Sequence, residues 1–197
     1  MRAETIKKLE ALLKDRDTAQ INLDGDHVHA AVMMILRYDD DEFSLLFIKR
    51  PDNVNDPFSG HIAFPGGKIR DGDGTKLNAA IRETYEEVGV NIQASGRVLG
   101  SLDDVNPNNP RAANIIVTPY VSFLPEEVEL KPCEYEVEAA LWIPVSHLTD
   151  ENNFLIRLRE REGRSKEDYV YSYDKYIIWG MTGRILRQFL QLSSGLF

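Results

Sequence analysis

Three glutamates, Glu83, Glu86 and Glu87, lie close together near the end of the stretch AFPGGKIRDGDGTKLNAAIRETYEEVGV, residues 63–90. On a helix these positions are i, i+3 and i+4, so the carboxylates share one face and repel by about a few tenths of a kcal/mol per pair. Mg²⁺ and Mn²⁺ prefer carboxylate oxygens and retain waters that can face a substrate phosphate. The spacing indicates a divalent-cation site for phosphate chemistry or, more simply, a solvated acidic helix face.

Two glycines, Gly66 and Gly67, precede the acidic residues. Glycine permits backbone dihedrals and close approaches that other residues do not. From Lys76 the apolar residues recur at helical spacing on the side opposite the glutamates, and Gly89 follows where a C-cap glycine is expected. A glycine turn beside an acidic helix is a suitable geometry for diphosphate chemistry.

The stretch resembles the Nudix box, whose usual form reads G-x5-E-x7-R-E-U-x-E-E-x-G-U, with U an apolar residue. Residues 82–90, RETYEEVGV, match its second half, with Thr84 at an aliphatic position. Counted from Gly67, Asp73 stands at the first glutamate position, and the gap to Arg82 is one residue longer than usual. This departure resembles the coenzyme A pyrophosphatase branch of the family.

Other segments are similar to the same branch, so that the resemblance spans about residues 28–190. Residues 60–67, GHIAFPGG, resemble the G-x-x-x-F-P-G-G segment ahead of the box, and residues 178–182, IWGMT, resemble its I-W-G-x-T element. Two features differ: the loop between Arg50 and Gly60 departs from the branch signature, and His61 stands where a glutamine is expected.

The resemblance implies a metal-dependent hydrolase that uses Mg²⁺ or Mn²⁺ to cleave the diphosphate bond of a small-molecule nucleotide. The branch implies coenzyme A or acyl-CoA as substrate, with 4′-phosphopantetheine and 3′,5′-ADP as products. Another nucleotide (ADP-ribose, NADH, a dinucleotide or a nucleoside triphosphate) is the alternative within this class. A non-catalytic nucleotide-sensing Nudix domain is a second alternative, although such domains usually lose the glutamates retained here. An isomerase with a catalytic cysteine is disfavoured because no matching motif surrounds Cys133.

The resemblance also assigns roles inside the box. Glu83 and Glu87 would be the main metal ligands, and Glu86 a further or water-mediated one. Gly67 would supply a backbone carbonyl or free space at the metal. Arg82 would pair with a box glutamate and fix its rotamer rather than contact the substrate.

A general base outside the box is expected near a pattern that reads EVEAALW here. Its first residue, Glu136, is our candidate, and Glu83 is the main rival. Glu134 and Glu138 are equally acidic neighbours, so composition does not single out Glu136. The catalytic candidates are therefore Glu83, Glu86, Glu87 and Glu136.

On the substrate side, Arg50 follows a predicted strand and precedes a loop, where an arginine can meet a phosphate. Phe64, Gly66 and Gly67 complete the predicted substrate-binding set, and Trp179 is expected to be a core or pocket-wall residue. A basic cluster interleaved with acidic and apolar residues is interpreted as a solvated face: Arg157, Arg159, Arg161 and Arg164.

The expected elements are helices at about 3–16, 76–88, 146–148 and 182–192, strands at 28–37, 43–49, 97–102, 115–124 and 137–145, and extended segments at 61–64 and 169–178. This order mixes α and β without regular alternation, which gives an α/β (α+β) class. The resemblance implies the Nudix α/β/α sandwich with a mixed β-sheet, formed by residues 1–197 as one domain. The polar loop at 103–114 is a candidate rim for the substrate.

The composition of the chain limits the kinds of partner and the cellular compartment that we expect. The chain has 197 residues and a net charge of −9, so binding to nucleic acid would need a local basic patch and is not expected. Cys133 is the only cysteine, which excludes an internal disulfide and fits a reducing compartment. No apolar segment of signal-peptide or membrane-spanning length is found, so we expect a cytoplasmic protein without membrane contact. Nudix proteins are often homodimers, and the sequence leaves the oligomeric state open.

Overall fold

The computed structural model describes residues 2–21, 27–56, 58–107, 114–161 and 164–197. The elements follow the order α1 (Arg2–Lys14), β1 (Val28–Asp39), β2 (Glu42–Lys49), β3 (Ile62–Ala63), β4 (Gly66–Lys68), η1 (Asp71–Asp73), α2 (Lys76–Val88), α3 (Ile92–Ser95), β5 (Arg97–Ser101), β6 (Ile115–Leu124), β7 (Ala139–Pro144), α4 (Val145–Thr149), η3 (Glu151–Asn153), β8 (Phe154–Arg161), β9 (Arg164–Tyr173), β10 (Tyr176–Ile178) and α5 (Gly180–Leu192).

A mixed sheet forms the centre of the molecule, with strand order β3-β2-β1-β6-β5, and with β4 paired to β1 and β7 paired to β2. β1 runs parallel to β6 and antiparallel to both β2 and β4. The sequence of β1 is almost continuously apolar because helices cover both faces of the sheet. Its residues Met33 to Leu36 are fully buried, and each such side chain contributes about 1.5–3 kcal/mol of transfer free energy.

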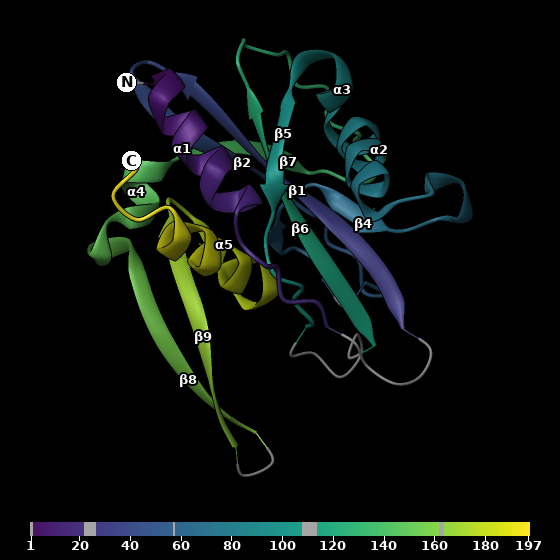
Figure 1. Cartoon of the computed structure of the whole chain (residues 1–197). Helices are drawn as coiled ribbons and strands as arrows, with labels where there is room; N and C mark the ends of the chain where they lie inside the picture. The colour runs from purple at the N-terminus through teal and green to yellow at the C-terminus, as the bar shows by residue number, and fades with distance from the viewer. Residues whose placement is uncertain (1, 22–26, 57, 108–113, 162–163) are drawn as a thin grey trace.

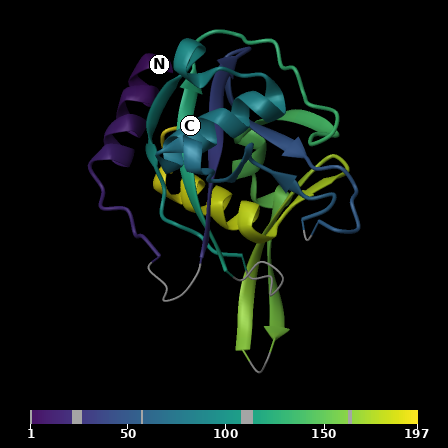
Figure 2. The same cartoon turned by 90° about the vertical axis from the view of Figure 1, so that its right-hand side faces the viewer.

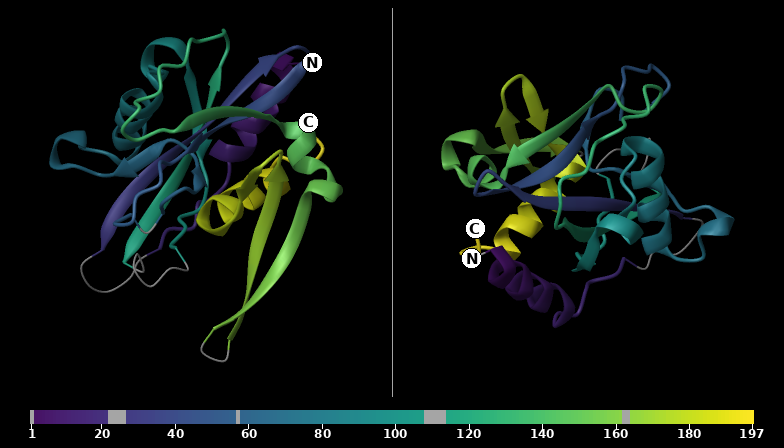
Figure 3. Two further views of the ribbon diagram at one scale, coloured as in Figure 1. Left: turned by 180° about the vertical axis from the view of Figure 1, so that it is seen from behind. Right: turned by 90° about the horizontal axis from the view of Figure 1, so that it is seen from above.

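Helices pack on both faces of this sheet (Figures 1 and 3). On one face, Ala79, Ala80 and Val88 of α2 share a buried cluster with Met33 and Ile35 of β1. On the other face, the apolar residues of α1 and α5 pack against Met34 and Leu36 and their neighbours. The α/β/α sandwich with a mixed sheet, predicted from the family resemblance, is therefore confirmed.

A second sheet has the order β10-β9-β8, and its β8–β9 hairpin extends away from the body (Figures 1 and 2). The sequence analysis missed β8. It also predicted one extended segment at 169–178, which is wrong because a turn separates β9 from β10, with Asp174 at φ 50°. The arginine-rich residues of β8 lack an apolar period and form a strand through pairing with β9.

The short elements β4, η1, α3 and η3 were not predicted, and the other elements agree with prediction to within a few residues. β1 and β2 form a hairpin, and its turn residues Asp40 and Asp41 have φ values of 47° and 61°. The first helix ends at Lys14, two residues before the predicted limit. Of the predicted substrate rim at 103–114, residues 108–113 lie outside the described part of the chain. No helix among the described residues has the length and apolar character needed to cross a membrane.

Candidate active site

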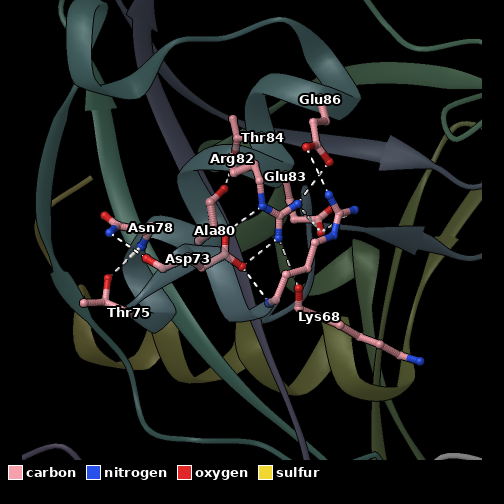
Figure 4. Close-up of polar contacts among 10 residues, drawn as sticks. Lys68, Asp73, Thr75, Asn78, Ala80, Arg82, Glu83, Thr84 and Glu86 are labelled. Carbon is pink, nitrogen blue, oxygen red and sulfur yellow. Dashed lines mark hydrogen bonds and ion pairs between the residues drawn. The ribbon is translucent and has the colours of Figure 1, made fainter.

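The acidic helix α2 begins and ends where its capping residues place it. The Thr75 hydroxyl accepts a hydrogen bond from the N–H of Asn78, and the Thr84 hydroxyl donates to the carbonyl of Ala80 (Figure 4). Gly89 adopts the left-handed conformation at φ 74° and donates to the carbonyl of Tyr85. These caps fix the register of the helix and hence the face on which the glutamates lie.

The glycine turn is held against the sheet because β4 pairs with β1, with Gly66 opposite Val32 and Gly67 opposite Ala31. A Cβ atom at Gly66 would lie 2.3 Å from the carbonyl oxygen of Ala31, so no larger residue fits there. A Cβ atom at Gly67 would lie 2.5 Å from the carboxyl carbon of Glu83. The two glycines therefore permit two separate close approaches, one to the sheet and one to the acidic helix.

Glu87 is the most deeply placed carboxylate of the box, with 2% exposure. Its Oε2 accepts a hydrogen bond of 2.8 Å from the N–H of Gly66, and its Oε1 lies 4.0 Å from Arg50 Nη1. Burial raises the pKa of Glu87 to about 8; the Gly66 hydrogen bond and Arg50 oppose this rise, and Glu83 and Glu136 add to it. A cation at this position would compensate a carboxylate that is costly to ionise alone.

Arg82 of α2 connects Asp73 of η1 to the glutamates of the acidic helix (Figure 4). Its Nε and Nη2 donate to Asp73 at 2.7 and 2.9 Å, and its Nη1 donates to Glu83 at 2.7 Å and Glu86 at 3.0 Å. The hydrogen bonds from Arg82, and one from the N–H of Arg70, lower the pKa of Asp73 to about 2. The expected role of Arg82, pairing with a box glutamate, is confirmed, and Asp73 anchors the guanidinium from the other side.

Glu86 differs from its two partners. Its side chain is 38% exposed and lies 3.2 Å from Arg70 Nη1, and Arg70 Nη2 also lies 3.5 Å from Glu83 Oε1. Within the described ranges, no group of at least three His, Cys, Asp or Glu side chains is already gathered as a metal site. The structure thus brings Glu83 and Glu87 to one place and directs Glu86 toward two arginines.

A cavity of about 530 Å³ contains most of the predicted residues. Arg50, Gly66, Gly67, Glu83, Glu87 and Glu136 line it together with Pro51, Asn53, Asp56, Lys68, Ile69, Arg70 and Tyr135. The expected residues from the box, the glycine turn and the end of β2 therefore lie in one place. Lys68, Arg70 and Asp56 were not predicted, because no motif distinguishes them from other surface charges.

The structure separates Glu136 from its acidic neighbours. The N–H of Cys133 donates to the carbonyl of Glu87 at 2.9 Å, which ties this turn to the end of α2. Glu136 then lines the cavity, whereas Glu138 pairs with Lys49 at 2.5 Å. Tertiary contacts therefore give the distinction between Glu136 and Glu138 that composition could not.

A second cavity of about 840 Å³ adjoins the first and shares Arg50, Asp56, Gly66, Gly67 and Lys68 with it. Its apolar lining comes from β1 and β6: Val28, Ala30, Val32, Ile115 and Val117. Aromatic side chains line it as well: Phe58, His61, Phe64 and Trp179. The His61 and Trp179 rings lie 4.8 Å apart, and burial lowers the pKa of His61. Trp179 is thus a pocket-wall residue, as expected.

Arg50 is oriented at the junction of the two cavities. Its Nε and Nη2 donate to Asp56 Oδ2 at 3.0 and 2.8 Å, and its own N–H donates to the carbonyl of His61. Burial opposes ionisation of Asp56, but hydrogen bonds from the N–H of Phe58 and from Arg50 lower its pKa on balance. A guanidinium held in this way faces both the carboxylates and the larger cavity.

The donor set suits a hard divalent cation. It offers carboxylate oxygens from Glu83 and Glu87, which line one cavity with Gly66 and Gly67. The buried carboxyl of Glu87 has one short protein hydrogen bond, and its other oxygen lies 4.0 Å from a guanidinium nitrogen. Cation binding, phosphate binding and activation of a water molecule are all possible with these groups.

Comparison with known proteins agrees with this geometry. The model of the family described as NUDIX domain matches residues 27–163. The uncharacterized Nudix hydrolase NudL of Salmonella paratyphi B is 32% identical over 130 residues, covering 66% of this chain and 65% of that protein. The chain therefore spans less than two thirds of this relative's length, and the Salmonella newport NudL gives the same values.

Solved structures support the fold alone. A MutT/nudix family protein from Enterococcus faecalis superimposes with a TM-score of 0.54 at 19% identity, covering 98% of this chain and 80% of that one. A C. elegans Ap4A hydrolase gives a TM-score of 0.51 at 19% identity, covering 60% and 81% of the two chains.

Proposed function

The chain belongs to the Nudix family, and on this premise we propose that it is a metal-dependent hydrolase of nucleoside diphosphate derivatives. Coenzyme A or an acyl-CoA is the favoured substrate, with water adding across the diphosphate to give 4′-phosphopantetheine, or its acyl form, and 3′,5′-ADP. The observation that carries the proposal is the cavity in which Glu83 and Glu87 lie beside the Gly66–Gly67 turn.

Mg²⁺ or Mn²⁺ is the cofactor that these residues would hold. Glu83 and Glu87 are the principal ligands in this proposal, the Gly67 carbonyl is a further one, and Glu86 acts through water or after leaving Arg70. When bound, such a cation neutralises diphosphate charge and lowers the pKa of the water that attacks phosphorus.

The remaining groups orient the ligands. Arg82 donates to Glu83 while Asp73 holds its other edge, so the carboxylate of Glu83 keeps one rotamer. The N–H of Gly66 does the same for Glu87. Arg50, fixed by Asp56, is placed to bind a diphosphate oxygen without having to reorganise.

Glu136 is the proposed general base, which takes a proton from the attacking water. Its rival Glu83 already accepts a hydrogen bond from Arg82 and is a principal cation ligand in this proposal, so its oxygens are engaged. Glu136 lines the same cavity, and its negative charge contributes to the raised pKa of Glu87, so the two carboxylates interact electrostatically. Loss of Glu136 would therefore slow the chemical step more than it weakens cation binding.

The larger cavity is the proposed site for the rest of the nucleotide. Phe64, 2% exposed and in contact with Phe47 at 4.7 Å between ring centroids, forms a rigid wall, and His61 and Trp179 supply further aromatic surface. Such walls suit the flat, apolar faces of a nucleobase. They do not by themselves distinguish coenzyme A from another nucleotide, so other nucleotide substrates stay open as alternatives.

A hydrolysis screen with Mg²⁺ and with Mn²⁺ tests the proposal, with products identified by mass spectrometry. The panel contains coenzyme A, acetyl-CoA, ADP-ribose, NADH, a diadenosine polyphosphate and a nucleoside triphosphate. Release of 4′-phosphopantetheine and 3′,5′-ADP supports coenzyme A as the substrate. Faster hydrolysis of another compound in the panel would make that compound the proposed substrate instead. Absence of turnover by protein that binds nucleotide and cation would support the sensing alternative instead.

A further inference from the structure

The larger cavity, of about 840 Å³, is also lined by Arg159 of the protruding β8–β9 hairpin. Arg159 belongs to a charged group centred on Asp168, a carboxylate that is only 1% exposed. Arg159 Nε and Nη2 lie 2.5 and 3.0 Å from the two oxygens of Asp168, and Arg157 Nη2 lies 3.3 Å from Oδ2. Arg157 and Arg159 are exposed, as expected for a solvated face, and in addition both pair with the buried carboxylate of Asp168.

Trp179 holds the same two guanidiniums from another side. The guanidinium carbons of Arg157 and Arg159 lie 5.3 and 5.4 Å from the centroid of the Trp179 ring, within the range of a cation–π contact. Trp179 itself lines the cavity. The arginines nevertheless keep 48% and 46% of their side-chain surface exposed, so donors remain available to a ligand.

The positive charges around Asp168 outnumber its single negative charge. One carboxylate faces two guanidiniums at short range, and Arg184 of α5 lies in the field of the same carboxylate. In a chain of net charge −9, such a local excess beside a cavity is a feature that packing alone does not require.

We propose that Arg157 and Arg159 bind a second anionic group of the substrate, a phosphate monoester on its nucleoside part, separate from the diphosphate that is cleaved. The inference rests on the proposed function and extends it to substrate class. The cavity leads from the Gly66–Gly67 turn and Arg50 past aromatic walls to Arg159. It therefore combines two arginines, Arg50 and Arg159, with aromatic walls that suit a nucleoside.

A phosphate monoester fits this pair better than a neutral group. It carries about −1.5 to −2 charges near pH 7 and three acceptor oxygens, and two guanidiniums match that charge and geometry. Asp168 and Trp179 orient the guanidiniums before the ligand arrives, so little rotamer freedom is lost on binding. The pair acts on binding and specificity and does not contact the reacting phosphorus.

Calorimetric binding of adenosine 3′,5′-bisphosphate and of AMP to the full chain tests this directly, since the two ligands differ only in the monoester. We expect the wild type to prefer the bisphosphate by about 10-fold or more, and Arg159→Gln to reduce this preference to about 2-fold or less. The same substitution should raise KM for coenzyme A relative to dephospho-coenzyme A with kcat little changed. The binding assay needs no turnover, so its result stands whether or not the chain is a hydrolase.

Arg37→Gln is the matched control. Arg37 also lies over a tryptophan, 4.3 Å from the Trp142 centroid, and also pairs with an aspartate, Asp39 at 3.5 Å, but it does not line the cavity. This variant should keep the wild-type preference. If Arg159→Gln does not fold, the double variant Arg159→Gln/Asp168→Asn removes the buried charge as well. A wild type without preference, or an unchanged preference in the arginine variants, would overturn the inference.

Discussion

Replacing Gly67 by alanine perturbs the candidate site by one methyl group at a defined place. The new Cβ would lie 2.5 Å from the carboxyl carbon of Glu83 and 2.7 and 2.8 Å from its oxygens. Ordinary contact begins at 3.4 Å, so the carboxylate or the turn must move by about 0.9 Å. Glu83 is also held by Arg82 at 2.7 Å, and the displacement therefore strains that hydrogen bond too.

A displacement of about 1 Å in a positioning group can reduce turnover by about 10²-fold, and we expect a loss of this size in kcat/KM together with weaker Mn²⁺ binding. Enzyme assays, Mn²⁺ titration followed by electron paramagnetic resonance and thermal unfolding would measure the three effects. Gly72→Ala is the matched control, because a Cβ there meets nothing within 4 Å. Gly67→Ala with turnover and Mn²⁺ affinity within about threefold of wild type would refute the reasoning.

Three further predictions concern charged residues. Glu136→Gln should lower kcat by about 10²-fold or more, while Mn²⁺ affinity and the control Glu134→Gln stay near wild type. Asp73→Asn should reduce the free energy of unfolding by about 1–3 kcal/mol near pH 7. Because the folded-state pKa of Asp73 is lowered to about 2, this difference should disappear between about pH 4 and 2; a constant difference in denaturant titrations would contradict it. The pKa of Glu87 is raised to about 8, so cation-free protein should lose stability as pH rises from about 4.5 to 8, and Glu87→Gln should remove that loss. Mn²⁺ binding at pH 7 should accordingly release close to one proton from Glu87. Calorimetry in two buffers of different ionisation enthalpy measures this release, and a binding enthalpy that is the same in both buffers would contradict the prediction.

Local sequence patterns were sufficient to predict the helix that contains the box glutamates and the central strands beside it. α2 was predicted with both limits because a glycine follows its last turn and the apolar positions recur at helical spacing. β1 and β6 were predicted because they are buried on both faces and read as apolar runs. β4 was missed because Gly66–Lys68 has no apolar pattern and becomes a strand only by pairing with β1.

In the candidate site too, local sequence predicted some features, and others depend on tertiary contacts. The box spacing predicted that Glu83, Glu86 and Glu87 share one face of the helix, but it could not show that Glu83 and Glu87 are buried or that Arg70 contacts Glu86. Likewise, the group around Asp168 depends on the register of β8 against β9, which the sequence does not specify. The cytoplasmic location and the single-domain organisation of residues 1–197 stay predictions from the sequence, and the oligomeric state stays open.

The most direct test of the central claim compares wild type with Glu87→Gln in the hydrolysis of coenzyme A with Mn²⁺, with products separated and weighed by mass spectrometry. Glu87 is the buried carboxylate beside the glycine turn, and glutamine preserves its shape and can still accept the hydrogen bond from Gly66. The account predicts 4′-phosphopantetheine and 3′,5′-ADP from wild type, and a loss of about 10³-fold or more in the variant with its fold retained. Turnover by Glu87→Gln at the wild-type rate would contradict it.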